Sequence, residues 1–212
     1  GEACGKHRMA KLMRREGLRS QTGYQRRKGH YGGKSTQAAP NTLARQFKVP
    51  APNISWVTDI TYIRTQEGWL YLAVVLDLFS RQIIGWAMKP RMTADLAVDA
   101  LLMAVWRRKP KQPVLVHSDQ GWQYQQPHYQ RMLTDRSLTQ SMSRKGNCLD
   151  NAAMESFFGT LKAEYFHLNH FESIEQLQAG IEQYIYYYNH DRIKLKLKGL
   201  SPVQYRTQAF GL

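Results

Sequence analysis

Cysteine is scarce in this sequence, and its scarcity excludes two kinds of cross-link. Only Cys4 and Cys148 occur among the 212 residues, which is too few for a disulfide framework or a four-cysteine zinc site. Cys4 and His7 have a ligand-like spacing, but two ligands do not make a structural zinc site. We therefore expect a fold stabilised by a hydrophobic core, in the reducing setting of the cytoplasm.

Long apolar runs are also missing. The longest run, from Trp69 to Leu76, is too short to span a bilayer, and no signal peptide is visible. Hydrophobic residues make up 42% of the chain and aromatic residues 11%, as is typical of globular proteins. The sequence therefore predicts a globular protein with no membrane partner.

Acidic residues are nearly absent from the first 50 residues. This segment has 12 of the 30 Lys and Arg residues but only two of the 16 acids, so it carries +10 of the net charge of +14. Such a segment is attracted to a polyanion through counterion release. An anionic lipid surface is less favoured as the polyanion, because the segment contains no amphipathic basic helix with exposed aromatic residues. Nucleic acid is the favoured partner, with Arg26, Arg27 and Lys28 as contacts to its backbone. A basic tail that only aids solubility is the alternative.

The pattern of apolar residues predicts an α/β fold with a mixed five-stranded sheet flanked by helices. The expected strands are Ile54–Arg64, Trp69–Leu78, Gln82–Met88, Pro113–His117 and Ser137–Met142. The expected helices are a basic helix within 6–18, one capped by Thr93 and ending near Arg107, Pro127–Thr134, one beginning near Asn151, Ser173–Asn189, and a short one after Ser201 and Pro202. Trp69–Leu78 is almost continuously apolar, which indicates burial on both faces.

Composition divides the chain into three expected parts. Residues 1–52 form a basic helix followed by an extended basic linker, since Gly, Pro and charged residues dominate them. Residues 53–192 form the globular core, and 193–212 form a C-terminal basic tail with a short helix.

The helix near Asn151 has a helical stripe of apolar residues and a chemically unusual flank. The stripe consists of Met154, Phe157, Phe158, Leu161 and Tyr165. At 100° per residue, Glu155, Gly159 and Lys162 lie beside this stripe rather than opposite it. They could present a metal ligand and a phosphate contact to one substrate. For Glu155 taken alone, a solvated helix flank is the more favoured interpretation.

Two aspartates are expected to meet at the sheet. Asp59 lies in the middle of the first strand, and Asp119 follows the fourth. A helix between two strands of one sheet makes a right-handed crossover, so the fourth strand can return parallel beside the first. Clustered carboxylates repel one another and suit Mg²⁺ or Mn²⁺. With Glu155 leaning over the sheet, the three acids could hold two cations roughly 3.5–4 Å apart.

The residues around these acids resemble a known family. WVTDITYI contains Asp59, VHSDQGWQY contains Asp119, and GNCLDNAAMESFFGTLKAE contains Glu155, with 35 residues between the last two acids. Together with the ending YYYNHDRIKLKLKGLSPVQY, these motifs are similar to the retroviral-integrase-like transposases of bacterial insertion sequences, in particular the downstream reading-frame product of copy-out-paste-in elements.

The resemblance implies a ribonuclease-H-like fold, with Asp59, Asp119 and Glu155 as catalytic, metal-binding residues. It implies Mg²⁺ or Mn²⁺ as cofactor, with two ions expected. Lys162 corresponds to the basic residue that contacts the DNA end, and the nearby loop adds Arg144, Lys145 and Asn147 as candidate contacts. Residues 1–52 would be the remnant of a helix-turn-helix region.

The implied activity is DNA cleavage followed by 3′-OH strand transfer at element ends, in a bacterial, nucleoid-associated protein. Double-stranded DNA, both element ends and target, is the implied partner. A homo-oligomer on DNA is expected, and the upstream reading-frame protein could be a further partner. Two alternatives stay open: a ribonuclease-H-like nuclease or resolvase that only hydrolyses, and a non-catalytic DNA-binding remnant.

Overall fold

A mixed five-stranded sheet forms the centre of the protein. The structure is a computed structural model and describes residues 5–18, 38–144 and 151–210. Its strands are β1 (Ser55–Arg64), β2 (Trp69–Asp77), β3 (Ile83–Lys89), β4 (Val114–Ser118) and β5 (Leu138–Met142). Its α-helices are α1 (Lys6–Arg15), α2 (Ala94–Arg108), α3 (Pro127–Asp135), α4 (Ala152–Glu164), α5 (Ile174–His190) and α6 (Pro202–Phe210). Each predicted strand and helix is confirmed to within a few residues.

The strand order is β3-β2-β1-β4-β5. β1, β2 and β3 form an antiparallel meander, which short turns can connect. After α2 the chain returns as β4, which lies parallel to β1, and β5 lies parallel to β4. This mixed sheet with flanking helices is the predicted fold class.

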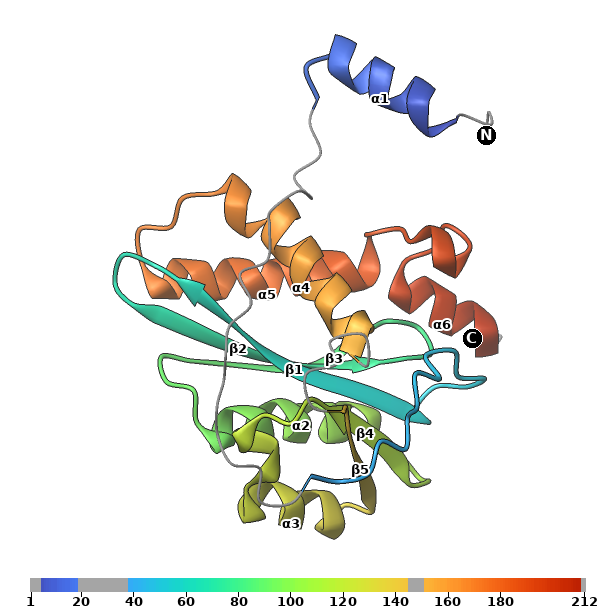
Figure 1. Ribbon diagram of the computed structural model, residues 1–212, viewed down its shortest axis with the longest axis vertical. Helices are drawn as coiled ribbons and strands as arrows, with labels where there is room; N and C mark the ends of the chain where they lie inside the picture. Colours follow the sequence, from blue (N-terminus) through green and yellow to red (C-terminus); the bar gives the residue numbers. More distant parts are fainter. Residues whose placement is uncertain (1–4, 19–37, 145–150, 211–212) are drawn as a thin grey trace.

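Both faces of the sheet are covered. Alternate residues of β2 enter two separate cores: Ala73 and Val75 pack with α2 and α3, while Leu72 and Val74 pack with α4 and α5. Figure 1 shows the same arrangement, with α4 and α5 above the sheet and α2 and α3 below it. Burial on both faces explains why β2 is almost continuously apolar rather than alternating.

The contact between α2 and β3 is too close for any side chain at Gly85. A Cβ atom built there would lie 2.1 Å from the carbonyl oxygen of Ala100 and 2.8 Å from the backbone nitrogen of Ala104. The glycine therefore lets the helix backbone approach the strand directly.

The start of the globular part lies before residue 53, which corrects the expectation of an extended linker as far as Pro52. Leu43 is buried in the core beneath α4 and α5. The backbone N–H groups of Thr42 and Leu43 donate to the Ser141 hydroxyl at 3.0 and 3.1 Å. Phe47 and Val49 also pack against this core, so the segment is attached to the globular part although its composition is polar.

The two terminal helices differ in how they pack. α1 forms as predicted, with Gly17 in the left-handed conformation after it, but none of its residues is buried. α6 packs on α5, and Ser201 and Pro202 at its start are buried. Residues 193–210 are therefore attached to the core and are not a loose basic tail.

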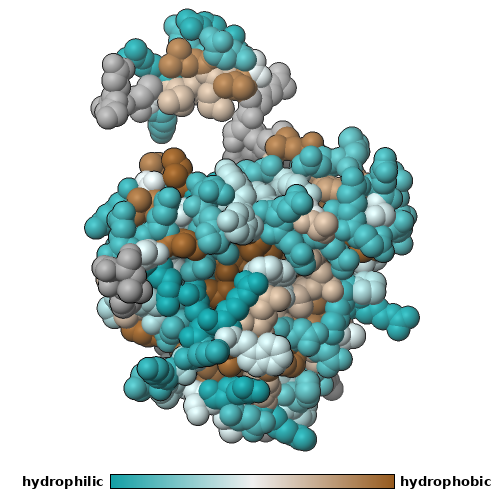
Figure 2. Space-filling model, turned by 180° about the vertical axis from the view of Figure 1, so that it is seen from behind, coloured by the Kyte–Doolittle hydropathy of each residue, from teal (hydrophilic) through white to brown (hydrophobic). Residues whose placement is uncertain are grey.

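The surface is largely hydrophilic. On the face seen in Figure 2, hydrophobic residues occur in separate patches among hydrophilic ones. Among the residues that the structure describes, no helix is both long and apolar enough to cross a membrane.

Asn189, near the end of α5, joins this helix to the edge strand β3. Its side-chain amide donates to the Ile83 carbonyl at 2.9 Å and accepts from the Ile83 N–H at 2.8 Å, and the residue is buried. The side chain thus makes a pair of hydrogen bonds with β3 at the outer edge of the sheet, as a neighbouring strand would.

Asn189→Ala should lower the free energy of unfolding by about 2–4 kcal/mol, because two buried backbone groups lose their partners. Chemical denaturation followed by circular dichroism measures this change. The control is Asn169→Ala, which removes an exposed hydrogen bond to the Tyr165 carbonyl and should cost under about 0.5 kcal/mol. Equal losses in the two variants would contradict the bridging role of Asn189.

Candidate active site

Asp59 lies on β1, on the sheet face that α4 and α5 cover. The side chain is half-buried, and its Oδ1 accepts from the N–H of Ile60 at 2.8 Å. Its neighbours on the same face, Val57 and Ile63, belong to the core under these helices. A carboxylate at this position lies at the border of an apolar layer, where leaving it uncompensated is costly.

Asp119 follows β4 directly. It is exposed, yet enough protein surrounds it that desolvation raises the pKa of its carboxyl above the ordinary value, while the Gly121 N–H, donating to Oδ1 at 2.9 Å, lowers it. The net upward shift of the pKa means that the ionised carboxyl is disfavoured here. A nearby positive charge would offset this cost.

Strand pairing brings the two aspartates together. β1 and β4 are parallel, with Val57 opposite His117, and each aspartate lies two residues beyond that pair. The predicted parallel pairing of these strands is confirmed.

Both acids also affect one buried phenol. The pKa of Tyr124 lies well above its ordinary value, first because of burial and then because of the negative charges of Asp59 and Asp119. The Tyr124 hydroxyl lies 3.5 Å from the Thr58 hydroxyl on β1. The two carboxylates are therefore close to the same point of the structure.

Glu155 lies in the first turn of α4 and is half-buried. Met154, Phe157, Phe158 and Leu161 are buried in the core below, which confirms most of the predicted stripe, whereas Tyr165 is only half-buried. Gly159 is exposed and Lys162 is half-buried. Glu155 and Lys162 thus lie at the rim of the core.

The three acids do not form a metal-sized cluster in this structure. In the ranges 5–18, 38–144 and 151–210, no three His, Cys, Asp or Glu side chains are grouped closely enough to hold an ion. The structure pairs the strands that carry Asp59 and Asp119, and Glu155 lies one turn into α4, whose start contacts β1. Their catalytic and metal-binding role therefore stays a prediction.

The start of α4 is attached to the strand that carries Asp59. Asn151 occupies the N-cap position, as predicted, but its side chain makes no capping hydrogen bond. Its Nδ2 instead lies 3.5 Å from the Thr58 carbonyl oxygen. Asp150, the other predicted cap, lies outside the described residues. The residue expected to cap the helix connects it to β1.

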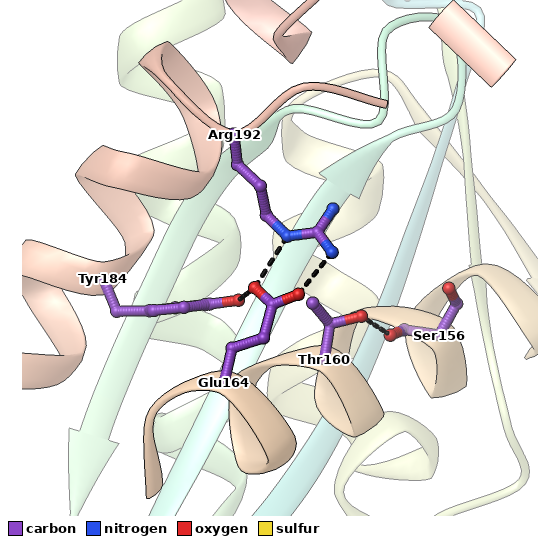
Figure 3. Close-up of polar contacts among 5 residues, drawn as sticks. All are labelled: Ser156, Thr160, Glu164, Tyr184 and Arg192. Carbon is purple, nitrogen blue, oxygen red and sulfur yellow. Dashed lines mark hydrogen bonds and ion pairs between the residues drawn. The ribbon is translucent and has the colours of Figure 1, made fainter. Parts of the chain in front are cut away.

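The other end of α4 is fixed by a partly buried ion pair, shown in Figure 3. Glu164 accepts from Arg192 Nε at 2.7 Å, from a second Arg192 nitrogen, and from the Tyr184 hydroxyl at 2.8 Å. Burial alone would raise the pKa of Glu164, but the hydrogen bonds from Arg192 and Tyr184 outweigh it and the pKa is lowered. These bonds join α4 to α5 and to the segment after it.

The predicted DNA contacts fall in different parts of the chain. Lys162 Nζ lies 5.8 Å from the centre of the Tyr62 ring. Arg144 is exposed. Arg26, Arg27, Lys28, Lys145 and Asn147 lie outside the described residues.

Arg144 is nevertheless placed near Asp119 by the residue before it. The Ser143 N–H donates to the Ser118 carbonyl at 2.8 Å, and the Ser143 carbonyl accepts from Gln120 Nε2 at 3.1 Å. The chain therefore enters the loop toward α4 directly beside Asp119.

Sequence reasoning missed the aromatic residues around this site. Tyr124 carries no signal of its own in the sequence, although it is the phenol next to both aspartates. Tyr62 and Trp69, at the far end of the β1–β2 hairpin, are exposed. The signal that could have found Tyr62 is the alternation along the end of β1, where Tyr62 and Arg64 are exposed on either side of buried Ile63.

The fold and the aspartate pair define a class of protein, the integrase-like catalytic cores. A family model described as integrase core domain matches residues 49–148, and a second with the same description matches 155–210. The catalytic core of HTLV-2 integrase in complex with magnesium has a TM-score of 0.60 and 19% identity, over 74% of this chain and 98% of that chain. A simian T-cell lymphotropic virus intasome, in complex with PP2A regulatory subunit B56 gamma, has a TM-score of 0.64 and 20% identity, over 82% of this chain and 60% of that chain.

Sequence relatives narrow this class to one family. Transposase InsF for insertion sequence IS3A of Escherichia coli is 47% identical over 201 residues, which cover 94% of this chain and 70% of InsF. Putative transposase InsK for IS150 of E. coli is 46% identical over 85% of this chain and 64% of InsK. An uncharacterized transposase-like protein of Haemophilus influenzae is 49% identical over 84% of this chain and 82% of that protein. The chain belongs to the bacterial insertion-sequence transposases with an integrase core, as its motifs predicted, and spans about two thirds of InsK.

The ion pair between α4 and the segment after α5 predicts a pH dependence. Because the pKa of Glu164 is lowered in the folded protein, its contribution to stability is complete above the ordinary value of 4.5 and is lost as pH falls through the folded value. Glu164→Gln should therefore melt at a lower temperature than the parent above about pH 5, and the gap should close as the pH falls below 4.5. Thermal unfolding at a series of pH values measures both effects. The control is Glu182→Gln, an exposed position on α5. A gap that does not depend on pH would contradict the assignment.

Proposed function

We propose that this chain is a polynucleotidyl transferase that cuts one DNA strand at the end of an insertion sequence and joins the new end elsewhere. The observation that carries this proposal is the parallel pairing of β1 with β4 in an integrase-core fold, which places Asp59 and Asp119 each two residues beyond the Val57–His117 pair. The relatives named as transposases support it.

The donor chemistry of the site fits Mg²⁺ or Mn²⁺. Carboxylates are the hard oxygen ligands that these ions prefer. The pKa of Asp119 is raised mainly by desolvation, so a bound cation would compensate the cost of its charge. By our proposal Asp59, Asp119 and Glu155 hold two ions, which would supply Lewis acidity at the scissile phosphodiester. Related HTLV-2 integrase was solved with magnesium, which supports this cofactor.

The proposed reaction has two phosphoryl-transfer steps. In the first, water attacks a phosphodiester, one P–O bond forms and another breaks, and a strand with a free 3′-OH leaves. In the second, this 3′-OH attacks a second phosphodiester and displaces its 3′ oxygen, which joins one element end to the other. The protein forms no covalent bond to DNA in either step.

The remaining residues would position the DNA. Lys162, two turns after Glu155 on the same flank of α4, contacts the reacting end, and Arg144 contacts the strand beside Asp119. Lys145 and Asn147, which follow Arg144 closely in the sequence, are further proposed contacts. The basic arm with Arg26, Arg27 and Lys28 grips the phosphate backbone without reading sequence.

The proposal extends to organisation and partners. The basic segment before Leu43 would serve as a DNA-binding arm left from a helix-turn-helix region, and the part from Leu43 onward as the catalytic core with its attached C-terminal segment. An oligomer on double-stranded DNA is proposed because one solved relative is an intasome. The upstream reading-frame protein is a proposed partner, and the bacterial nucleoid the proposed location.

Removing a single acid tests the catalytic assignment. Asp59→Asn, Asp119→Asn and Glu155→Gln should each lower cleavage and joining of labelled element ends by more than about a hundredfold, since an inner ligand matters more than the outer partners whose loss costs 10–100-fold. DNA affinity should change little. The control is Asp135→Asn, an exposed position at the end of α3.

The same assay separates the alternatives. Cleavage without joining by the parent protein would indicate a nuclease or resolvase, and DNA binding without either would indicate a non-catalytic remnant. Normal joining by Glu155→Gln in Mg²⁺ would remove this residue from the triad.

Variants of Lys162 and variants of the basic arm should lose different properties. Neutralising Arg26, Arg27 and Lys28 should weaken binding to all DNA and flatten the plot of log affinity against log salt by about 0.9 unit for each phosphate that the arm no longer binds. Lys162→Ala should instead reduce the joining rate at saturating protein, because it positions the end. A salt titration and a joining assay on both variants test this. An unchanged salt slope for the arm variant, or a normal saturated rate for Lys162→Ala, would contradict the division of roles.

A further inference from the structure

The far half of β1 has an open edge beside the aspartate pair. β2 pairs with β1 along its whole length, from Trp56 to Arg64, but β4 pairs only with Ser55–Val57. From Thr58 onward, therefore, no strand in the described part of the chain flanks the second edge of β1. Alternation along β1 places Tyr62 on the opposite face of the sheet from Asp59, but Lys162 of α4, which covers the Asp59 face, reaches to within 5.8 Å of the Tyr62 ring centre at this edge.

Two exposed aromatic residues lie together at the end of this half. Tyr62 on β1 is 45% exposed and Trp69 on β2 is 42% exposed. Their ring centroids are 5.3 Å apart at an angle of 74°. They are diagonal neighbours across the strand pair, since Arg64 lies opposite Trp69. Two large rings left side by side in solvent indicate a binding surface rather than a core.

A cation lies near each ring. The Arg64 guanidinium carbon is 5.8 Å from the Trp69 ring centre, and Lys162 Nζ is 5.8 Å from the Tyr62 ring centre. Both distances are near the 6 Å limit of a cation–π contact. The occupant that fits alternating π faces and positive charges is a nucleic-acid strand.

The hairpin that carries these rings is held rigidly. In its turn, the backbone N–H and the hydroxyl of Thr65 donate to the Gly68 carbonyl at 2.7 and 3.0 Å. Glu67 Oε2 accepts from the N–H of Ile174, the first residue of α5, at 2.8 Å. A surface fixed at both its turn and a neighbouring helix loses little conformational entropy when a ligand binds.

We propose that Tyr62 and Trp69 stack against an unpaired base of the DNA end, while Arg64 and Lys162 contact the adjoining phosphates. This rests on the proposed function, in which Asp59 and Asp119 cut one DNA strand. The two rings would hold the part of that strand that lies beyond the cut. Tyr62 lies three positions after Asp59 on β1, a rise of about 10 Å along the strand. The base is specified as unpaired because a base that has left the duplex stack exposes its π faces to both rings.

Affinity for two DNA forms tests the proposal. The full chain is titrated, without metal, against a fluorescein-labelled duplex with a short 3′ overhang and against its blunt counterpart, by fluorescence anisotropy. Tyr62→Ala and Trp69→Ala should each weaken binding to the overhang DNA at least about fivefold, since one stacked base contributes about 1–3 kcal/mol. Binding to blunt DNA should change under about twofold, and Trp69→Phe should retain most of the preference.

Salt dependence separates the rings from the cations. Trp69→Ala removes no charge, so the slope of log affinity against log salt should stay the same. Arg64→Ala should flatten it by about 0.7 unit on the single-stranded overhang. The matched control is Trp106→Ala, which removes a 64% exposed ring from α2 and should affect neither DNA.

A second measurement uses the unmutated chain, so that misfolding of a variant cannot obscure the result. A 5-iododeoxyuridine placed in the overhang should crosslink on irradiation to the peptide that contains Tyr62 or Trp69. Crosslinks found only elsewhere would overturn the proposal. So would equal weakening on both DNAs, an effect of Trp106→Ala as large as that of Trp69→Ala, or a change of oligomeric state in Trp69→Ala, which would mark the rings as an interface between copies of the chain. Because no turnover is needed, these results stand apart from the cleavage assays of the acidic variants.

Discussion

The parallel pairing of β1 with β4 is the contact on which the rest of the site depends. Three residue pairs, from Ser55 to Val57, fix the register that places Asp59 and Asp119 together. The same short pairing leaves the far half of β1 without a second neighbour among the described strands. A longer β4 would cover the edge where Tyr62 lies. The register of β1 and β4 therefore brings Asp59 and Asp119 close together, and the shortness of their pairing leaves the edge of β1 beside them without a partner strand among the described residues.

Polar contacts fix both ends of the helix that carries Glu155, its start to β1 and its end to α5 and the segment after it. Asn151 reaches the Thr58 carbonyl at its start, and Glu164 binds Arg192 and Tyr184 at its end. Between them, buried apolar residues press the helix onto the core. Burial supplies most of the stability of such a helix, and the polar contacts select one orientation because their geometry is directional.

Acidic residues in this chain show why a carboxylate in a strand does not by itself identify a site. Asp77, at the end of β2, is fully buried, and burial raises its pKa. Its oxygens accept from the N–H groups of Asn53 and Phe79 at 3.0 and 2.9 Å, which compensates part of that cost. Asp77 thus joins neighbouring segments, whereas Asp59 lies at the border of the core. The degree of burial and the hydrogen-bond partners separate the two cases, and strand periodicity contains neither.

The sequence by itself determined the strands and helices, their order, the mixed sheet and the family, because periodicity and local motifs are properties of neighbouring residues. It also predicted that Asp59 and Asp119 would meet, since crossover handedness restricts the topology. Tertiary structure alone decided that Leu43 belongs to the core, that Asn151 binds β1 instead of capping α4, and that Tyr62, Trp69 and Lys162 come together. Each of these depends on contacts between residues far apart in the chain, whose partners are chosen by packing and by the need to satisfy buried polar groups.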